Sequence, residues 1–339
     1  MTDPEFSHWH PVASLEQAGV QLAEQPLGVT LLGQPLVLWR DGGGTLRVWA
    51  DRCPHRGAQL SLGRVCEGRL ECPYHGWQFE GAGHCVRVPA LPQFTPPATF
   101  RASSFDVQEH TGMVWVRLAD GALPPPAFAA EADVQLRKLT CGPYEVATSA
   151  PRIVENFLDM AHFAFVHEGW LGMRSLPGGD QLSGAAIEDY RVEPTPAGLI
   201  ATGCRAWQPQ SSVQATGAAQ VEYRYEVNGP YSAVLTKVPD AASVAVANYR
   251  ESIALFICPL TPESSRVWFR LAVADFASSD DALRQFQHTI FMQDQPVLES
   301  QQPRRLPLGA GAELQVASDR ASVAYRRYLS GLGVRWGTC

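Results

Sequence analysis

Two short cysteine–histidine motifs constrain the fold of this chain more than any other feature. Residues 53–57 read Cys-Pro-His-Arg-Gly, and residues 72–77 read Cys-Pro-Tyr-His-Gly-Trp. Each motif offers one thiolate and one imidazole, so two such loops can present two sulfurs and two nitrogens to one place. A proline stiffens each loop, and a glycine without a Cβ lets the loop backbone approach closely. The motifs therefore predict a metal site built from two loops.

Two metal centres compete for these four ligands. A structural zinc ion takes two Cys and two His, usually in the spacing C-x₂₋₄-C followed by H-x₃₋₅-H. Here Cys and His alternate within each loop, which suits two irons, one held by Cys53 and Cys72 and the other by His55 and His75. The spacing favours a [2Fe–2S] cluster over zinc. It also favours either metal centre over the alternative that the four side chains are buried and bind no metal.

The two loops resemble those of a Rieske [2Fe–2S] domain, over roughly residues 8–118. The resemblance implies that His55 and His75 bind the outer, reducible iron. Respiratory-chain Rieske proteins join their loops by a disulfide whose cysteines lie inside the motifs. Cys66 and Cys85 lie outside both motifs, so we expect them to be ordinary buried thiols.

A second motif lies in the Phe-rich segment 155–167. Asn156, Asp159 and His162 recur at three-residue steps, about 60° apart on a helix, whereas His167 lies about 140° from His162. The two imidazoles can meet at one metal only if the helix loosens or ends between them, for example by a π-type turn. A core helix with incidental polar residues is the alternative, but four unpaired polar groups are costly to bury in an apolar segment.

This segment resembles the N-x-x-D-x-x-H-x₄-H motif in the catalytic domain of Rieske oxygenases. The resemblance implies that His162, His167 and a distant aspartate bind a mononuclear Fe(II) as a facial triad with open positions for O₂. We choose Asp294, in a similar segment at residues 291–301, over the weaker candidates Glu299, Asp280 and Asp281.

The same resemblance assigns roles to Asn156 and Asp159, which we expect to be catalytic residues beside the iron. Asp159 would bridge His162 of its own chain and His75 of a neighbouring subunit, so that an electron passes between subunits. Relatives of this length are usually homotrimers.

The pattern of strands and turns predicts an all-β domain at residues 1–122, a proline-rich linker at 123–130 and a second domain at 131–339. In the first, strands at 36–39 and 46–49 flank a glycine-rich turn. Expected elements elsewhere are a strand at 113–118, helices at 151–168 and 280–302, and strands at 222–227, 252–258 and 267–274.

The predicted fold class is α+β. The resemblance implies an N-terminal all-β Rieske domain followed by a helix-grip (START/Bet v 1-like) catalytic domain, in which a curved antiparallel sheet wraps around a long helix. A mostly apolar pocket for a small organic substrate should lie between the sheet and the helix.

Composition excludes several classes of protein. The net charge is −7, which argues against a nucleic-acid partner because phosphate binding needs a basic face. No basic stretch followed by an apolar run opens the chain, and no apolar window is long enough to span a membrane, so we expect a cytoplasmic protein. No G-x-G-x-x-G follows a strand, so NAD(P)H should be oxidised by a separate reductase, with or without a ferredoxin that docks near His55 and His75.

The expected function is that of a terminal oxygenase, which uses O₂ and reductase electrons to oxygenate a small aromatic substrate. The short relatives include O-demethylases of the vanillate and dicamba type, which favours hydroxylation or O-demethylation of an aromatic acid. Ring cis-dihydroxylation, and N-demethylation or other oxidation of a non-aromatic substrate, are the alternatives. A pure electron carrier would not need the 156–167 motif, and a helix-grip ligand-binding module would not need the Cys–His loops.

Overall fold

The computed structural model describes residues 3–244 and 249–339, which form two compact units. The first unit contains Phe6–Pro125, and the second contains Pro126–Cys339 together with Asp3–Glu5. Among the described residues, no helix combines the length and the apolar character needed to cross a membrane. No disulfide joins any of the eight cysteines, all of which the structure describes; Cys85 is buried, as expected, and Cys66 is only half-buried.

The first unit is built from two antiparallel sheets. The larger has the order β1-β10-β9-β4-β3-β2 and the smaller the order β5-β6-β7-β8. The strands are β1 (His10–Ser14), β2 (Leu27–Leu31), β3 (Gln34–Arg40), β4 (Leu46–Ala50), β5 (Arg64–Cys66), β6 (Arg69–Glu71), β7 (Gln78–Phe79), β8 (Cys85–Arg87), β9 (Ser104–His110) and β10 (Met113–Arg117). The predicted hairpin is confirmed, because β3 and β4 pair around the glycine-rich turn.

Aromatic side chains fill the core of this unit. The rings of Trp39 and Trp49 meet edge to face with centroids 4.8 Å apart, and Trp49 meets Phe79 in the same way at 6.3 Å. Edge-to-face contacts of this kind add to the free energy of burying such large apolar surfaces. Cys53 and Cys72 belong to the same buried cluster, so the metal-binding loops start from a rigid base.

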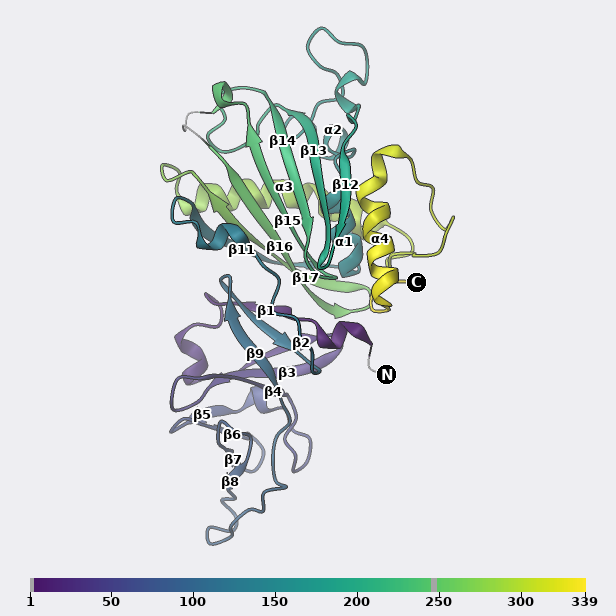
Figure 1. Ribbon diagram of the computed structural model, residues 1–339. Helices are drawn as coiled ribbons and strands as arrows, with labels where there is room; N and C mark the ends of the chain where they lie inside the picture. Colours follow the sequence, from purple (N-terminus) through teal and green to yellow (C-terminus); the bar gives the residue numbers. More distant parts are fainter. Residues whose placement is uncertain (1–2, 245–248) are drawn as a thin grey trace. The chain divides into compact units, whose positions relative to one another are not determined.

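The second unit contains one seven-stranded antiparallel sheet (Figure 1), with the order β11-β17-β16-β15-β14-β13-β12. Its strands are β11 (Arg137–Val146), β12 (Arg191–Thr195), β13 (Gly198–Gln208), β14 (Ala219–Val227), β15 (Ser232–Pro239), β16 (Glu251–Thr261) and β17 (Ser264–Val273). In β14 the inward residues are buried and the outward ones are half-buried or exposed, which confirms the alternation predicted for this strand. β16 and β17 pair as predicted. Both strands are longer than predicted at the end where they meet, so a turn of only two residues connects them.

Four α-helices occur in the described part of the second unit: α1 (Ala150–Leu158), α2 (Phe163–Val166), α3 (Asp280–Ser300) and α4 (Arg320–Leu332). The long helix α3 lies across one face of the sheet (Figure 1), which is the predicted helix-grip arrangement. Pro296 lies inside α3 without ending it. Short 3₁₀ turns occur at Pro4–Ser7, Val20–Ala23, Leu60–Leu62, Ala129–Ala132, Ser183–Ala185, Ala241–Ser243 and Ala317–Asp319.

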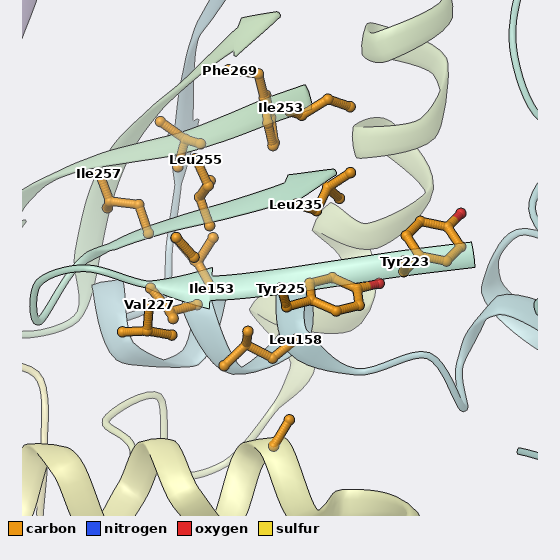
Figure 2. Packing of buried hydrophobic residues seen from close by; sticks show 14 of the residues in the cluster. Ile153, Leu158, Tyr223, Tyr225, Val227, Leu235, Ile253, Leu255, Ile257 and Phe269 are labelled. Atoms are coloured by element: carbon orange, nitrogen blue, oxygen red, sulfur yellow. The ribbon is translucent and has the colours of Figure 1, made fainter. Parts of the chain in front are cut away.

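The core of the second unit lies between the sheet and the helices α1 and α3. Figure 2 shows Ile153 and Leu158 of α1 facing side chains of β14, β15 and β16. Tyr223 and Tyr225 project from the same face of β14, with their rings stacked 5.7 Å apart. This layer of apolar and aromatic side chains forms one wall of the cavity described below.

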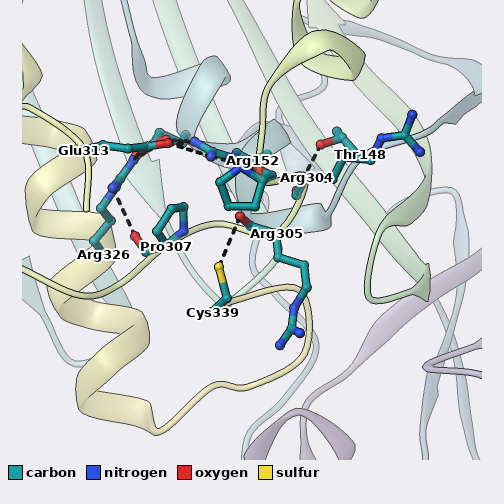
Figure 3. A network of polar contacts seen from close by, with 10 residues as sticks. Thr148, Arg152, Arg304, Arg305, Pro307, Glu313, Arg326 and Cys339 are labelled. Carbon is teal, nitrogen blue, oxygen red and sulfur yellow. Dashed lines mark hydrogen bonds and ion pairs between the residues drawn. The ribbon is translucent and has the colours of Figure 1, made fainter.

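Charged side chains fasten α1 to α4 and to the loop before it (Figure 3). Arg152 donates to both carboxylate oxygens of Glu313, at 3.1 and 2.7 Å, and Arg326 donates to Glu155 at 2.6 and 2.9 Å. Arg326 also contacts Glu313 at 2.5 Å. Two cations therefore alternate with two anions, so that no charge in the network lacks an opposite neighbour.

The prediction of one continuous helix over 151–168 is wrong. Helix α1 ends at Leu158, because Asp159 takes an extended conformation and its carboxylate accepts the backbone N–H of Ala161 at 2.8 Å. An aspartate side chain that binds nearby backbone competes in this way with the helical hydrogen bonds. The break comes before His162 rather than between the two histidines, and the short α2 separates them.

Candidate metal centres and substrate cavity

The two Cys–His loops have the same internal hydrogen bonds. In the first loop the N–H of Cys53 donates to Ala58 and that of Gly57 donates back to Cys53. In the second the N–H of Cys72 donates to Trp77 and that of Gly76 donates back to Cys72. Both glycines have a positive φ, 74° and 67°, a conformation that side chains with a Cβ rarely adopt.

The four expected ligands form two pairs at the ends of these loops. The imidazoles of His55 and His75 lie with centroids 4.7 Å apart, and the ring of Trp77 stacks on His55 at 4.3 Å. Cys53 and Cys72 are each only 2% exposed. Burial raises the pKa of Cys53 to about 12, which means that its thiolate needs a cation beside it.

The donor set fits a two-iron cluster. Nδ1 of His55 is buried and has no hydrogen-bond partner, as expected of an atom kept for a metal. A single tetrahedral zinc ion would bring its four ligand atoms within about 4 Å of one another. Within the described residues, Cys53, His55, Cys72 and His75 form no such group, and the only set of three or more ligand atoms within 4.8 Å lies elsewhere. Two cysteines and two histidines are the donors of a Rieske cluster, one pair for each iron.

That other set consists of His162, His167 and Asp294. The two Nε2 atoms lie 3.2 Å apart, and Oδ1 of Asp294 lies 3.4 Å from His162 and 3.2 Å from His167. His162 and His167 cap the two ends of α2, and Asp294 comes from the middle of α3. Two imidazoles and one carboxylate on one side of an open space are the donors of a facial triad for Fe(II).

Three neighbours orient the triad. Asp159 lies 3.0 Å from Nδ1 of His162, and Asn156 donates to Asp294 at 3.2 Å. Gln293 lies 2.8 Å from Nδ1 of His167. With both Nδ1 atoms donating, both Nε2 atoms present lone pairs to the same point. Sequence reasoning missed Gln293, whose only signal is its position next to Asp294.

Asp159 is ionised in this setting. Burial disfavours its charge, but the hydrogen bond from the His162 side chain and those from the backbone N–H groups of Ala161 and His162 outweigh burial, so its pKa lies below the ordinary value. A carboxylate therefore sits behind the imidazole of His162.

The other acidic candidates for the third ligand lie outside the triad. Glu299 accepts from the backbone of Ala147 and from Gln295 instead. Asp280 pairs with Arg137 at the start of α3, next to Asp281.

A cavity adjoins the triad, and its atom-free space, including the solvent at its mouth, is about 690 Å³. Concave, mostly apolar spaces are where proteins usually bind small organic ligands. Apolar side chains from α1, β14–β17 and α3 make most of its walls. Phe163, Tyr223, Tyr225 and Phe269 are among its aromatic lining residues. Its polar lining, apart from the triad and the two tyrosines, is Asn156, Lys237 and Gln287.

Comparison with known proteins finds a family match for each part of the chain. The Rieske [2Fe-2S] domain matches residues 8–107, and the vanillate O-demethylase oxygenase C-terminal domain matches residues 146–335. The chain is 31% identical over 335 residues to methylxanthine N1-demethylase NdmA of Pseudomonas putida, covering 95% of this chain and 87% of NdmA.

Two further relatives extend the comparison. The structure of NdmA with caffeine matches with a TM-score of 0.78 at 28% identity, covering 96% of this chain and 90% of that one. The oxygenase component of dicamba O-demethylase from Stenotrophomonas maltophilia is 38% identical over 164 residues, 47% of this chain and 46% of that protein. The chain belongs to the Rieske non-haem iron oxygenases with a vanillate O-demethylase-type catalytic domain, and it is the component that oxygenates a small substrate with O₂ and electrons from a separate reductase.

Proposed function

We propose that this oxygenase removes a methyl group from a ring nitrogen or oxygen of a small aromatic compound, with His162, His167 and Asp294 as the ligands of its mononuclear iron. One observation carries the proposal: two imidazoles and a carboxylate converge on the wall of an apolar cavity. NdmA and the dicamba enzyme, which act on N-methyl and O-methyl groups by name, support the reaction class.

The atoms and electrons of this demethylation balance with O₂ and the electrons that a reductase supplies. One O₂, two electrons and two protons convert the methyl group to a hydroxymethyl group and release one water. The hydroxymethyl group then leaves as formaldehyde, and the nitrogen or oxygen that carried it keeps a proton. The bound iron supplies O₂ activation. The reductase supplies the electrons by way of the cluster.

The residues around the triad prepare the site. Asp159 holds His162 in the tautomer whose Nε2 faces the cavity, and Gln293 does the same for His167. The amide of Asn156 fixes one oxygen of Asp294. The rings of Phe163 and Phe291 form part of the apolar wall of the cavity.

The proposal extends to the cluster and the assembly. Cys53, His55, Cys72 and His75 hold the [2Fe–2S] cluster, and Asp159 passes its electron from His75 of a neighbouring chain to His162. This route needs a ring of subunits, for which we propose a homotrimer. We further propose docking of the reductase, or of a ferredoxin, near His55 and His75.

The domain boundaries are part of the same proposal. Residues 1–122 fold as the cluster domain and 131–339 as the catalytic domain, joined by the linker 123–130. The change of compact unit between Pro125 and Pro126 supports this division.

Formaldehyde release tests the reaction. The iron- and cluster-loaded chain is supplied with a reductase, NAD(P)H and a panel of N-methyl and O-methyl aromatics, including caffeine, theobromine, vanillate and dicamba. For an accepted substrate we expect one formaldehyde for each O₂ consumed. A product that keeps its methyl group and gains two hydroxyl groups would show ring dihydroxylation instead.

The His162→Ala variant is the matched control. It should keep the visible absorption of the Rieske cluster while losing turnover and mononuclear iron. Loss of the cluster absorption would mean that the two metal sites are not independent.

A further inference from the structure

A row of buried polar residues crosses the sheet at one end of the cavity. Strand register places Tyr223 of β14 opposite Lys237 of β15, and Lys237 opposite Glu251 of β16. The neighbouring row consists of Tyr225, Leu235 and Ile253. The polar row is therefore one step along the sheet from the apolar lining of the cavity.

Lys237 and Glu251 form an ion pair in this row. Nζ of Lys237 lies 2.9 Å from Oε2 of Glu251, and the two side chains are only 5% and 7% exposed. Nζ also donates to the carbonyl oxygen of Ser211 at 2.8 Å. The hydroxyl of Tyr249 donates to the same oxygen of Glu251 at 3.1 Å.

The ammonium group retains hydrogen-bonding capacity on the cavity side. An ammonium has three N–H donors, and the two acceptors described above use two of them. Lys237 lines the cavity together with Phe286, whose ring centroid lies 5.8 Å from Nζ. Among residues 3–244 and 249–339 no third acceptor contacts Nζ, so its third donor is available to a molecule bound in the cavity.

Stability alone is a poor reason for this pair. Replacing a buried ion pair by well-packed apolar residues is often neutral or stabilising. The surrounding wall is already apolar, and lysine is rare in this chain, with only Lys138 besides Lys237. A role in binding the molecule that occupies the cavity accounts for the ion pair of Lys237 and Glu251.

We propose that Lys237 is a specificity-determining residue that donates a hydrogen bond to a neutral carbonyl oxygen of the substrate. Glu251 cancels the charge of Lys237, so the polar end of the cavity selects uncharged amides, imides and lactams over aromatic carboxylates. A carboxylate placed there would lose its hydration and meet the charge of Glu251 without a free cation in return. The selected class differs from the aromatic acid expected from the sequence.

Matched amide and acid probes test this selectivity. Benzamide and benzoate have nearly the same shape, and their affinities for the iron- and cluster-loaded chain can be compared by calorimetry. We expect benzamide to bind about tenfold more tightly, the usual size of one hydrogen bond to a charged group. Equal or tighter binding of benzoate would overturn the inference.

Substitutions separate recognition from packing. In Glu251→Gln the lysine charge is no longer cancelled, so the preference should reverse by about tenfold or more toward benzoate. The Lys237→Met/Glu251→Gln variant leaves no buried unpaired charge and should bind both probes with similar affinity. Lys138→Met is the control and should keep the wild-type ratio. A wild-type ratio in both the Glu251→Gln and the double variant would show that the pair only stabilises the fold.

The inference rests on the proposed function in taking the cavity as the substrate site, and its failure is distinguishable from the failure of demethylation. Probe binding requires no turnover, and formaldehyde release is measured separately. If no panel compound releases formaldehyde but the probe ratio responds to the substitutions as described, demethylation fails and the selectivity stands.

Discussion

The two histidines of the triad differ in what holds them. His162 is backed by a carboxylate, Asp159, while His167 is backed by a neutral amide, Gln293. His167 is also the more deeply buried of the two, at 2% side-chain exposure against 14%. The orientation of His167 therefore depends on one hydrogen bond inside the protein, with little help from solvent.

Removal of that hydrogen bond should weaken iron binding. In Gln293→Leu, Nδ1 of His167 loses its acceptor, so the tautomer that presents Nε2 is no longer favoured. We expect the affinity for mononuclear iron to fall by about 10- to 100-fold, the usual effect of losing such a partner. Iron titration of the chain, with the cluster absorption as an internal standard, measures the change.

Gln293→Glu is the matched control, because it restores an acceptor of the same shape and should recover most of the affinity. Unchanged iron binding in Gln293→Leu would show that packing alone orients His167.

For single residues, the sequence predicted the candidate metal ligands better than the residues that contact and orient them. Cysteine, histidine and aspartate in fixed spacing point to metal chemistry because few other roles need that pattern. Gln293 and Lys237 have no such pattern. Gln293 depends on a contact between α2 and α3, and Lys237 on a strand register that brings Glu251 beside it.

At the scale of elements, the hairpin β3–β4, the alternating strand β14 and the long helix α3 followed from local pattern. The end of α1 did not, because apolar spacing continues through Asp159 while the carboxylate of that residue binds the backbone instead. The geometric argument that one smooth helix cannot bring His162 and His167 to one metal was right. The two histidines instead flank the single short helix α2, one at each end, and no π-type turn is needed.

The charged network between α1 and α4 should make stability depend on pH. Burial opposes the charge of Glu313, but its hydrogen bonds to Arg152 and Arg326 outweigh burial, so the folded-state pKa lies below the ordinary 4.5. A lowered folded pKa stabilises the protein above the unfolded pKa, and this contribution disappears as the pH falls through the folded value.

Glu313→Gln should therefore lower the free energy of unfolding by about 2 kcal/mol near neutral pH, since hydrogen bonds to charged groups are lost. The difference from the wild type should shrink as the pH falls below about 4.5. Urea titrations at several pH values measure it, with Glu263→Gln in an exposed turn as the control. A difference that stays constant with pH would mean that the charge of Glu313 contributes nothing.

At the scale of the whole molecule, the proposed electron route requires more than one chain. If the cluster of one subunit serves the iron of the next, two inactive variants should complement each other when they assemble together. His75→Ala lacks the cluster and keeps the triad, whereas His162→Ala keeps the cluster and lacks the mononuclear iron. Each homotrimer should be inactive.

Co-expression with two different affinity tags and sequential purification isolates mixed trimers that have assembled, which selects folded chains. Around a ring with one direction of transfer, either mixed composition contains a single interface where an intact cluster faces an intact iron site. We therefore expect about one third of the wild-type rate per trimer, whichever variant is in excess. Transfer within each chain would leave the mixed trimers as inactive as their parents, because no chain then holds both centres.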